Sequence, residues 1–340
     1  MKKSALFTIV RVLITILCFT VLFYKMRGDL SSFVESIKHA HFLWFFIALA
    51  LFTFCPFISV IRWDLLLRVQ GVRIPFFHLV KYFFIGLFFN NFMLGLTGGD
   101  LIKGYYVYKE TKEKKAEAVT TVLVDRIVGM FALIFVSGVA LLFLYGDERF
   151  THAIHIIFIV LGVYLLLGMI FMKKEVLKKI PFVENIYNRL PFRHTITKIY
   201  HALYIYRHNK ITLFITVLLS VLMQVSIIIA VYLLGKCFGV VHVPFINYFV
   251  FVPVISVVSA LPISVGGLGV GESAYVYFFN LIYEQSARYL AMALGLRVIM
   301  VLWSLVGGIF LLLPQNKISE EELEEVEKIE DQTIEEDTEL

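Results

Sequence analysis

The sequence predicts an all-α polytopic membrane protein: an inverted repeat with about six full crossings and two re-entrant, broken-helix hairpins, or about eight helices in all. The first observation is composition, since 59% of the 340 residues are hydrophobic, 17% are charged and the mean hydropathy is +0.84. The second is that apolar runs of about 20 residues, long enough to span hydrocarbon, recur along the chain. The third is a pair of glycine-rich interruptions, at residues 94–108 and 261–273. No soluble catalytic domain fits between these runs.

Six of the apolar runs are predicted to be full crossings. They cover approximately residues 5–24, 42–61, 119–144, 152–172, 211–235 and 288–313. The first run lacks a small-residue cleavage pattern, so we expect a retained helix rather than a signal peptide. Two further apolar stretches, 76–97 and 246–284, contain the glycine interruptions.

The charge of the loops predicts the orientation. Residues 173–210 carry nine Lys/Arg against two Glu, which places this loop in the cytoplasm. Counting crossings from there places both termini in the cytoplasm of a multi-pass protein of the cell membrane. Residues 76–100 then begin and end on one face, which favours a re-entrant hairpin. Residues 236–287 begin and end outside, as a second hairpin or as two full crossings.

Matching residues indicate two related halves that run in opposite directions. Gly98-Gly99 recurs as Gly266-Gly267, and Arg126 recurs as Arg297 after nearly the same interval along the chain. Inverted repeats with broken helices are typical of alternating-access transporters, whose substrate site lies where the breaks meet.

The predicted organisation has three parts. Residues 1–144 form the first membrane repeat, 145–316 the second, and 317–340 an acidic cytoplasmic tail. Within the tail, the stretch from Glu320 to Glu339 holds twelve acidic residues and one lysine. The chain before Glu320 holds thirty basic and fourteen acidic residues, a balance that suits anionic lipid headgroups.

The glycine interruptions predict an anion site. Non-helical backbone at membrane depth is tolerated only where it is buried in protein or lines a watery cavity. A glycine break exposes backbone N–H groups, and the half-helix that follows directs its positive end at the gap. The candidate substrate-binding residues are Arg297, Arg126, Asp125, Asp100, Glu272, Asn90, Asn91, Gly98, Gly99, Gly266, Gly267 and Gly269.

The two arginines are candidates for a bidentate phosphate clamp. Arg297 lies about ten residues into the last crossing without an acidic neighbour in sequence, so it ranks above Arg126. Arg126 adjoins Asp125 near the cytoplasmic end of its helix, and the pair could be purely structural. Glu272 or Asp100 could instead be the structural partner of Arg297.

The acidic and amide candidates have two interpretations each. Asp100 and Glu272 follow the glycine pairs, so they cap the half-helices that begin there, or they pair with the arginines and titrate. Asn90 and Asn91 lie deep in the first hairpin, where they satisfy broken backbone or line the cavity. No catalytic residue, metal site or cofactor is predicted, since the sequence has no Ser-His-Asp order, nucleotide phosphate loop or metal-ligand spacing.

The blocks "NNFMLGLTGGDLIKGYYVYKE", "AVTTVLVDRIVGM" and "ALPISVGGLGVGESAYVYFF" resemble the signature blocks of the lysylphosphatidylglycerol synthase transmembrane-region family. The resemblance covers about residues 5–313. It implies a polytopic bundle with re-entrant segments that moves lipids between leaflets. In the full synthases a separate soluble domain transfers the aminoacyl group; this chain is expected to be a stand-alone member, so lysyl transfer is not carried over.

The sequence therefore predicts a lipid flippase or transporter for an anionic phospholipid or a lipid-linked headgroup. Its expected partners are membrane lipids and, as a further option, a separate lipid-modifying synthase; nucleic acid is not expected, and the oligomeric state is open. Two alternatives remain: a membrane transferase that acts on a lipid carrier, and a non-transporting partner of a lipid synthase.

Overall fold

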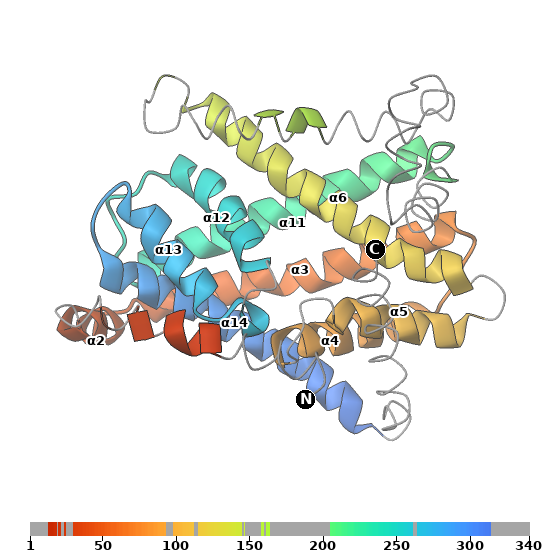
Figure 1. The fold of residues 1–340 in the computed structure, drawn as a ribbon, viewed down its shortest axis with the longest axis horizontal. Coiled ribbons are helices and arrows are strands. Elements are labelled where there is room, and N and C mark those ends of the chain that lie inside the picture. Colours follow the sequence, from red (N-terminus) through yellow and green to blue (C-terminus); the bar gives the residue numbers. More distant parts are fainter. Residues whose placement is uncertain are drawn as a thin grey trace.

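The computed structural model describes residues 30–92, 98–111, 115–144, 205–260 and 264–313, together with isolated positions among residues 13–24 and 146–163. Throughout these ranges the regular elements are helical (Figure 1). The first group is α2 (Leu30–Lys38), α3 (Phe42–Val69), α4 (Phe76–Phe92), α5 (Gly98–Glu110) and α6 (Lys115–Leu142). The second group is α11 (Lys210–Cys237), α12 (Phe245–Ala260), the 3-10 turn η2 (Val265–Gly267), α13 (Val270–Asn280) and α14 (Ser286–Leu312).

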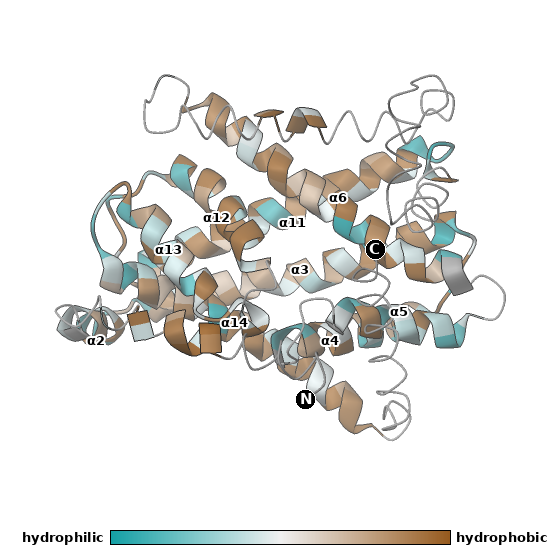
Figure 2. Ribbon diagram, in the orientation of Figure 1, coloured by the Kyte–Doolittle hydropathy of each residue, from teal (hydrophilic) through white to brown (hydrophobic). Residues whose placement is uncertain are grey.

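Four of the described helices are long and apolar enough to cross a membrane: α3, α6, α11 and α14. Their most apolar windows have mean hydropathies between 2.1 and 2.6. At 1.5 Å per residue they are about 40 Å long, against a hydrocarbon core of about 30 Å. Figure 2 shows apolar residues along most of their length. The predicted all-α polytopic membrane fold is confirmed, and these helices match four of the six predicted crossings.

Helices α3 and α11 pack against each other in antiparallel directions and form the most extensive helix contact of the described chain. At one end, the His41 N–H donates to the Cys237 carbonyl oxygen at 2.9 Å. At the other end, the Tyr206 hydroxyl donates to the Leu66 carbonyl oxygen at 3.0 Å. Burial raises the pKa of Tyr206, which keeps this hydroxyl protonated and able to donate.

The same order of helices recurs in both groups, and so do the contacts between them. Helix α4 packs on α5 and α14, just as α12 packs on α13 and α6. Helix α6 also contacts α5 and α11, just as α14 contacts α13 and α3. Since α3 and α11 are equivalent and antiparallel, the second group runs in the opposite direction to the first, which supports the inverted repeat. The predicted boundaries after residues 144 and 316 adjoin residues outside the described ranges and stay predictions.

The interrupted segments are pairs of short helices. Helices α4, α5, α12 and α13 have 17, 13, 16 and 11 residues. The longest is therefore about 25 Å long, less than the thickness of the hydrocarbon core. These lengths suit hairpins that enter and leave on one face, and the re-entrant path itself stays a prediction.

Two features differ from the expectation. The loop predicted from residue 62 begins only after Val69, because α3 continues for two further turns. Arg62, the first residue beyond the predicted crossing 42–61, is buried against acidic and polar partners inside the bundle. Helix α2 was also not predicted, since nine residues give a weak signal. Most of the predicted crossings 5–24 and 152–172, most of the loop 173–210 and all of the tail 317–340 lie outside the described residues.

Candidate functional site

The two glycine interruptions meet inside the bundle. The C-terminal end of α4 lies against η2, the turn that breaks the second hairpin. Gly266 has φ 54°, and a Cβ atom built there would lie 3.0 Å from the Asn91 carbonyl oxygen. Gly267 has φ 71°, and its Cβ would lie 2.7 Å from the Ser259 carbonyl oxygen. Because other residues rarely adopt these angles and a side chain would collide, glycine is required at both positions.

The second interruption is held by Glu272 and Arg297. Glu272 lies in the first turn of α13, and its side chain is 2% exposed. One carboxylate oxygen accepts the Gly269 N–H at 2.7 Å, and the other accepts Arg297 Nε–H at 2.8 Å. The remaining guanidinium nitrogens of Arg297 donate to the carbonyl oxygens of Gly266, at 2.9 Å, and Gly267, at 3.3 Å. Arg297 therefore fastens the broken backbone to α14.

The first interruption carries a corresponding pair with an additional cation. Asp100 lies in the first turn of α5 and accepts a hydrogen bond from Arg126 of α6. Lys103 Nζ lies 3.5 Å from the other Asp100 oxygen, and 4.9 Å from the ring centres of Trp63 and Phe83. Two cationic side chains thus share one carboxylate, which leaves this cluster with a formal charge of +1.

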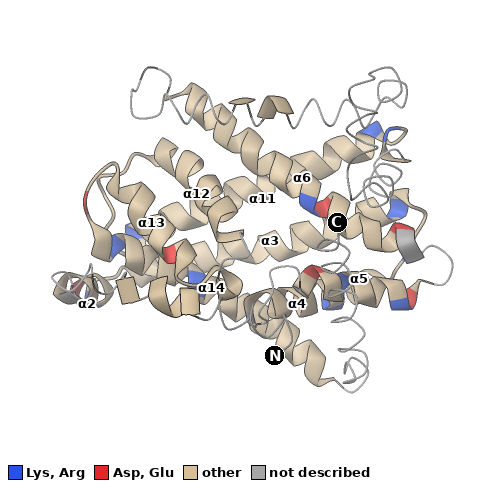
Figure 3. Ribbon diagram, in the orientation of Figure 1, with Lys and Arg blue, Asp and Glu red and all other residues tan. Residues whose placement is uncertain are grey.

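The two pairs occupy equivalent places in the two halves and differ in exposure. In each, an acid in the first turn of the second hairpin helix binds an arginine of the next long helix. The side chain of Arg126 is 41% exposed, whereas that of Arg297 is 16% exposed. Figure 3 shows how few charged residues lie along the long helices, so both clusters stand out against an uncharged background. In the first cluster the arginine is partly exposed and a lysine lies beside the acid, and in the second the acid and the arginine are both largely buried.

Asn90 and Gly99 join the two helices of the first hairpin. The Gly99 N–H donates to the Asn90 side-chain oxygen at 3.1 Å. A Cβ on Gly99 would lie 2.0 Å from the Gly86 carbonyl oxygen, so α4 and α5 touch backbone to backbone here. Asn90 thus satisfies broken backbone, which is one of its two predicted roles.

Two polar groups near the meeting point of the interruptions are buried without a hydrogen-bond partner among the described residues. They are the side-chain nitrogen of Asn91 and the hydroxyl of Ser264. A buried unsatisfied polar group costs about 1–3 kcal/mol. Their positions, one at the end of α4 and one just before η2, mark the junction as a place where water or a polar ligand would be stabilised.

Asp125 has a partner that sequence reasoning missed. Arg62 of α3 binds its two carboxylate oxygens at 2.7 and 3.0 Å and donates to the Ser220 hydroxyl of α11 at 2.7 Å. Both charged residues are 5% exposed. This contact ties together three crossings, and Asp125 therefore neutralises Arg62 rather than the adjacent Arg126. The only signals in the sequence were an arginine just beyond one apolar run and an acid within another.

The predicted site residues thus fall into three clusters. The first interruption holds Asp100, Arg126 and Asn90 together with Gly98 and Gly99. The second holds Glu272 and Arg297 together with Gly266, Gly267 and Gly269. Asp125 belongs to the contact with Arg62. The two arginines predicted to form one clamp therefore belong to different clusters. Lys103 was not among the predicted site residues.

Fold and site together define a polytopic membrane protein whose related halves each place an acid–arginine pair at a glycine break. The sequence profile described as "Lysylphosphatidylglycerol synthase TM region" matches residues 8–308. The chain belongs to this family, as its signature blocks indicated.

A more distant similarity links the chain to an archaeal protein. A UPF0104 membrane protein of Pyrococcus horikoshii is 29% identical over 138 residues, which cover 38% of this chain and 41% of that relative.

Proposed function

We propose that the protein moves a lipid with an anionic, phosphate-bearing headgroup between the leaflets of the cell membrane. The observation that carries this proposal is the cluster of Asp100, Lys103 and Arg126 at the first glycine break, where two cations lie beside one acid and the Arg126 side chain is 41% exposed. Family membership and the glycine breaks at the centre of the fold support it.

The headgroup phosphate binds at Arg126 and Lys103 in this proposal. A guanidinium binds phosphate oxygens through two parallel N–H donors, and the buried ammonium of Lys103 adds a second positive charge. The N-terminus of α5 lies at the same place and favours an anion through its partial positive charge. The unsatisfied Asn91 and Ser264 groups continue this polar path to the second break.

The structural contacts change the ranking of the two arginines. Sequence alone favoured Arg297 as the ligand, because it had no acidic neighbour along the chain. Each guanidinium nitrogen of Arg297 has a protein acceptor in the structure, so a phosphate there would have to displace Glu272 or a glycine carbonyl. Arg126 is the more exposed of the two, and its cluster has the surplus charge.

The test is movement of a fluorescent phosphatidylglycerol in proteoliposomes, measured by the fraction that an external reductant can reach over time. We expect Arg126→Gln to slow movement at least 10-fold, since a charge-assisted pair with phosphate contributes about 1.5–3 kcal/mol. Lys103→Gln should slow it as well. The matched control is Arg288→Gln, which removes a positive charge from the first turn of α14, where Arg288 donates to the Gly239 carbonyl.

Equal rates for Arg126→Gln, Lys103→Gln and the wild-type protein would remove the cluster from the mechanism. Absence of movement by the folded wild-type protein, alone and with anionic lipids of several headgroups, would overturn the function. In that case, turnover of a lipid carrier by the purified protein would indicate a transferase, and stable co-purification with a lipid synthase would indicate a partner protein.

A further inference from the structure

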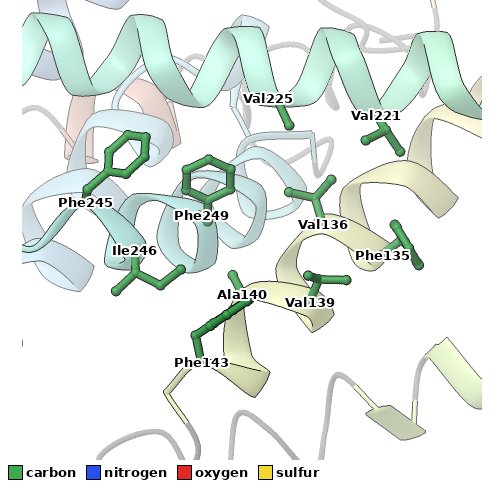
Figure 4. Close-up of a pocket in the computed structure, with 10 residues that line it drawn as sticks. All are labelled: Phe135, Val136, Val139, Ala140, Phe143, Val221, Val225, Phe245, Ile246 and Phe249. Atoms are coloured by element: carbon green, nitrogen blue, oxygen red, sulfur yellow. The ribbon is translucent and has the colours of Figure 1, made fainter.

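A groove between α6, α11 and α12 is lined only by apolar side chains. It has a volume of about 330 Å³. Figure 4 shows side chains from the three helices bordering one common space, among them Val136 and Val139 of α6, Val225 of α11 and Phe249 of α12. Two of these helices, α6 and α11, are long enough to cross the membrane.

The equivalent place in the first half is filled by aromatic rings. There, α14, α3 and α4 stand where α6, α11 and α12 stand in the second half. The ring centres of Phe57, Phe84 and Trp303 lie 6.0 to 6.4 Å apart and fill the space between these helices. A Cβ on Gly307 would lie 1.9 Å from the Phe84 carbonyl oxygen, so α14 and α4 touch along their backbones.

The difference between the two places is encoded in the sequence. Phe57 and Val225, and likewise Phe84 and Val252, are separated by the same number of residues as the two glycine pairs, so they occupy equivalent positions in the repeat. Ala132 and Trp303, and likewise Val136 and Gly307, are separated by the same number of residues as Arg126 and Arg297, so they too occupy equivalent positions. The three ring positions are therefore occupied by small aliphatic residues around α6, α11 and α12, and Val136 stands where Gly307 lets α14 and α4 touch. Of these residues, Val225 and Val136 line the groove. At the groove wall, Val225 stands where the equivalent place has the ring of Phe57, and this smaller side chain leaves space.

The occupant of the groove follows from its surroundings. Phe135 and Val139, on its α6 wall, are each 40% exposed, and Phe143 is 76% exposed, so the groove opens onto the outer surface of the bundle. Two of the helices that form this surface, α6 and α11, are long and apolar enough to cross a membrane, so we expect the groove to face lipid. Water gains nothing in a cavity without polar partners, whereas hydrocarbon gains dispersion contacts with every wall.

We propose that this groove is a binding site for one acyl chain of a membrane phospholipid. The acyl chain occupies, between α6, α11 and α12, the space that the Phe57 ring fills at the equivalent place between α14, α3 and α4. The proposal rests on the fold and its internal symmetry, and it holds whether or not the protein moves lipids.

The test uses a phospholipid with a photoreactive diazirine near the end of one acyl chain, incorporated into vesicles with the full-length protein. Irradiation followed by peptide mapping should label the groove segments of α6, α11 and α12 several-fold more than other lipid-facing segments. The double variant Val136→Phe/Val225→Phe fills the groove and should lose this excess. The matched control, Leu218→Phe/Leu222→Phe, adds the same rings to α11 at positions that are 56% and 52% exposed, and should keep it.

Labelling of the groove segments at the level of the other lipid-facing segments would overturn the proposal, as would undiminished excess labelling in the folded filled variant. If the double variant does not fold, Val225→Phe alone restores the ring found at Phe57, and the wild-type labelling pattern decides in any case. Groove labelling without lipid movement by the wild-type protein would contradict the proposed function and leave this site standing. Lipid movement without groove labelling would contradict this binding site and leave the proposed function standing.

Discussion

Arg297 fastens Glu272 to the broken backbone of the second hairpin: its Nε lies 2.8 Å from Glu272 Oε1, and its terminal nitrogens reach two glycine carbonyl oxygens. Asp100 and Arg126 form the related pair in the first half. The acid and arginine are 25 residues apart in the second pair and 26 in the first. Charges at equivalent places thus have different surroundings, one enclosed and one open.

Removing the Arg297 side-chain charge should lower the stability of the folded protein. Arg297→Met leaves the Glu272 carboxylate buried and unpaired, which costs about 3–5 kcal/mol. The melting temperature of the purified protein in detergent should fall markedly. Adding Glu272→Gln should restore part of the loss, because no uncompensated charge then remains. Unchanged melting of Arg297→Met would contradict the fastening role.

Loss of the acid should destabilise the protein more at the buried Arg62–Asp125 pair than at the Asp64–Arg68 pair of α3, in which the arginine is exposed. Asp125→Asn leaves a 5% exposed guanidinium without its counter-charge, which costs about 3–5 kcal/mol. Asp64→Asn removes the partner of Arg68 and leaves behind a cation whose side chain is 62% exposed and remains hydrated, so this change should cost less than the loss of Asp125 even though the Asp64 side chain is 12% exposed. Thermal unfolding of the two variants under the same conditions provides the comparison. Equal losses would mean that the Arg62 contact is not buried in the membrane-embedded protein.

Two glycines of the helix contacts should respond oppositely to alanine. At Gly307 an added Cβ would lie 1.9 Å from the backbone of α4, so Gly307→Ala must force α14 and α4 apart. Overpacking of this kind costs about 1–3 kcal/mol or more. At Gly104 the nearest atom would lie 3.5 Å away, an ordinary contact, so Gly104→Ala should be neutral or slightly stabilising. Equal effects of both changes on the melting temperature would argue against close packing of α4 on α14.

Gly266 should be intolerant of alanine because of its contact as well as its backbone angle. Gly146 is a matched control, since its φ of 99° is also positive and an added Cβ would have no neighbour within 4 Å. Gly146→Ala carries only backbone strain, of order ~1–3 kcal/mol. Gly266→Ala should lose more stability, because its Cβ also presses on Asn91 of the other half. A smaller loss at Gly266 would argue against contact between the two breaks.

Sequence reasoning predicted the features that depend on local chemistry. Glycine pairs mark backbone that cannot continue as helix, and their recurrence in step with the arginines indicated a repeat before any contact was known. The pairing of an acid with an arginine at each break was one of the stated alternatives. The cap that Glu272 forms on α13 was also foreseen, because an acid in a first helical turn favours that arrangement.

Features that depend on packing between distant segments were not predicted from the sequence. Arg62 was placed beyond the predicted crossing 42–61, because its neutralisation depends on Asp125, 63 residues away, and on Ser220, 158 residues away. Lys103 was not predicted, and the rings of Trp63 and Phe83 that lie near its Nζ belong to other helices. The groove is a lack of volume between three helices, and no single stretch of sequence displays such a lack.

The position of Arg62 has a consequence for biogenesis. Ribosomes deliver α3 to the membrane before Asp125 has been synthesised, and well before Ser220. An isolated guanidinium costs about 2.5–3.5 kcal/mol at the centre of an inserting helix, so α3 must first hold Arg62 toward the headgroup layer. The arrival of α6 supplies the counter-charge, and α11 supplies the hydroxyl. Arg62 on α3 therefore gains its last polar partner only after α11 has been synthesised.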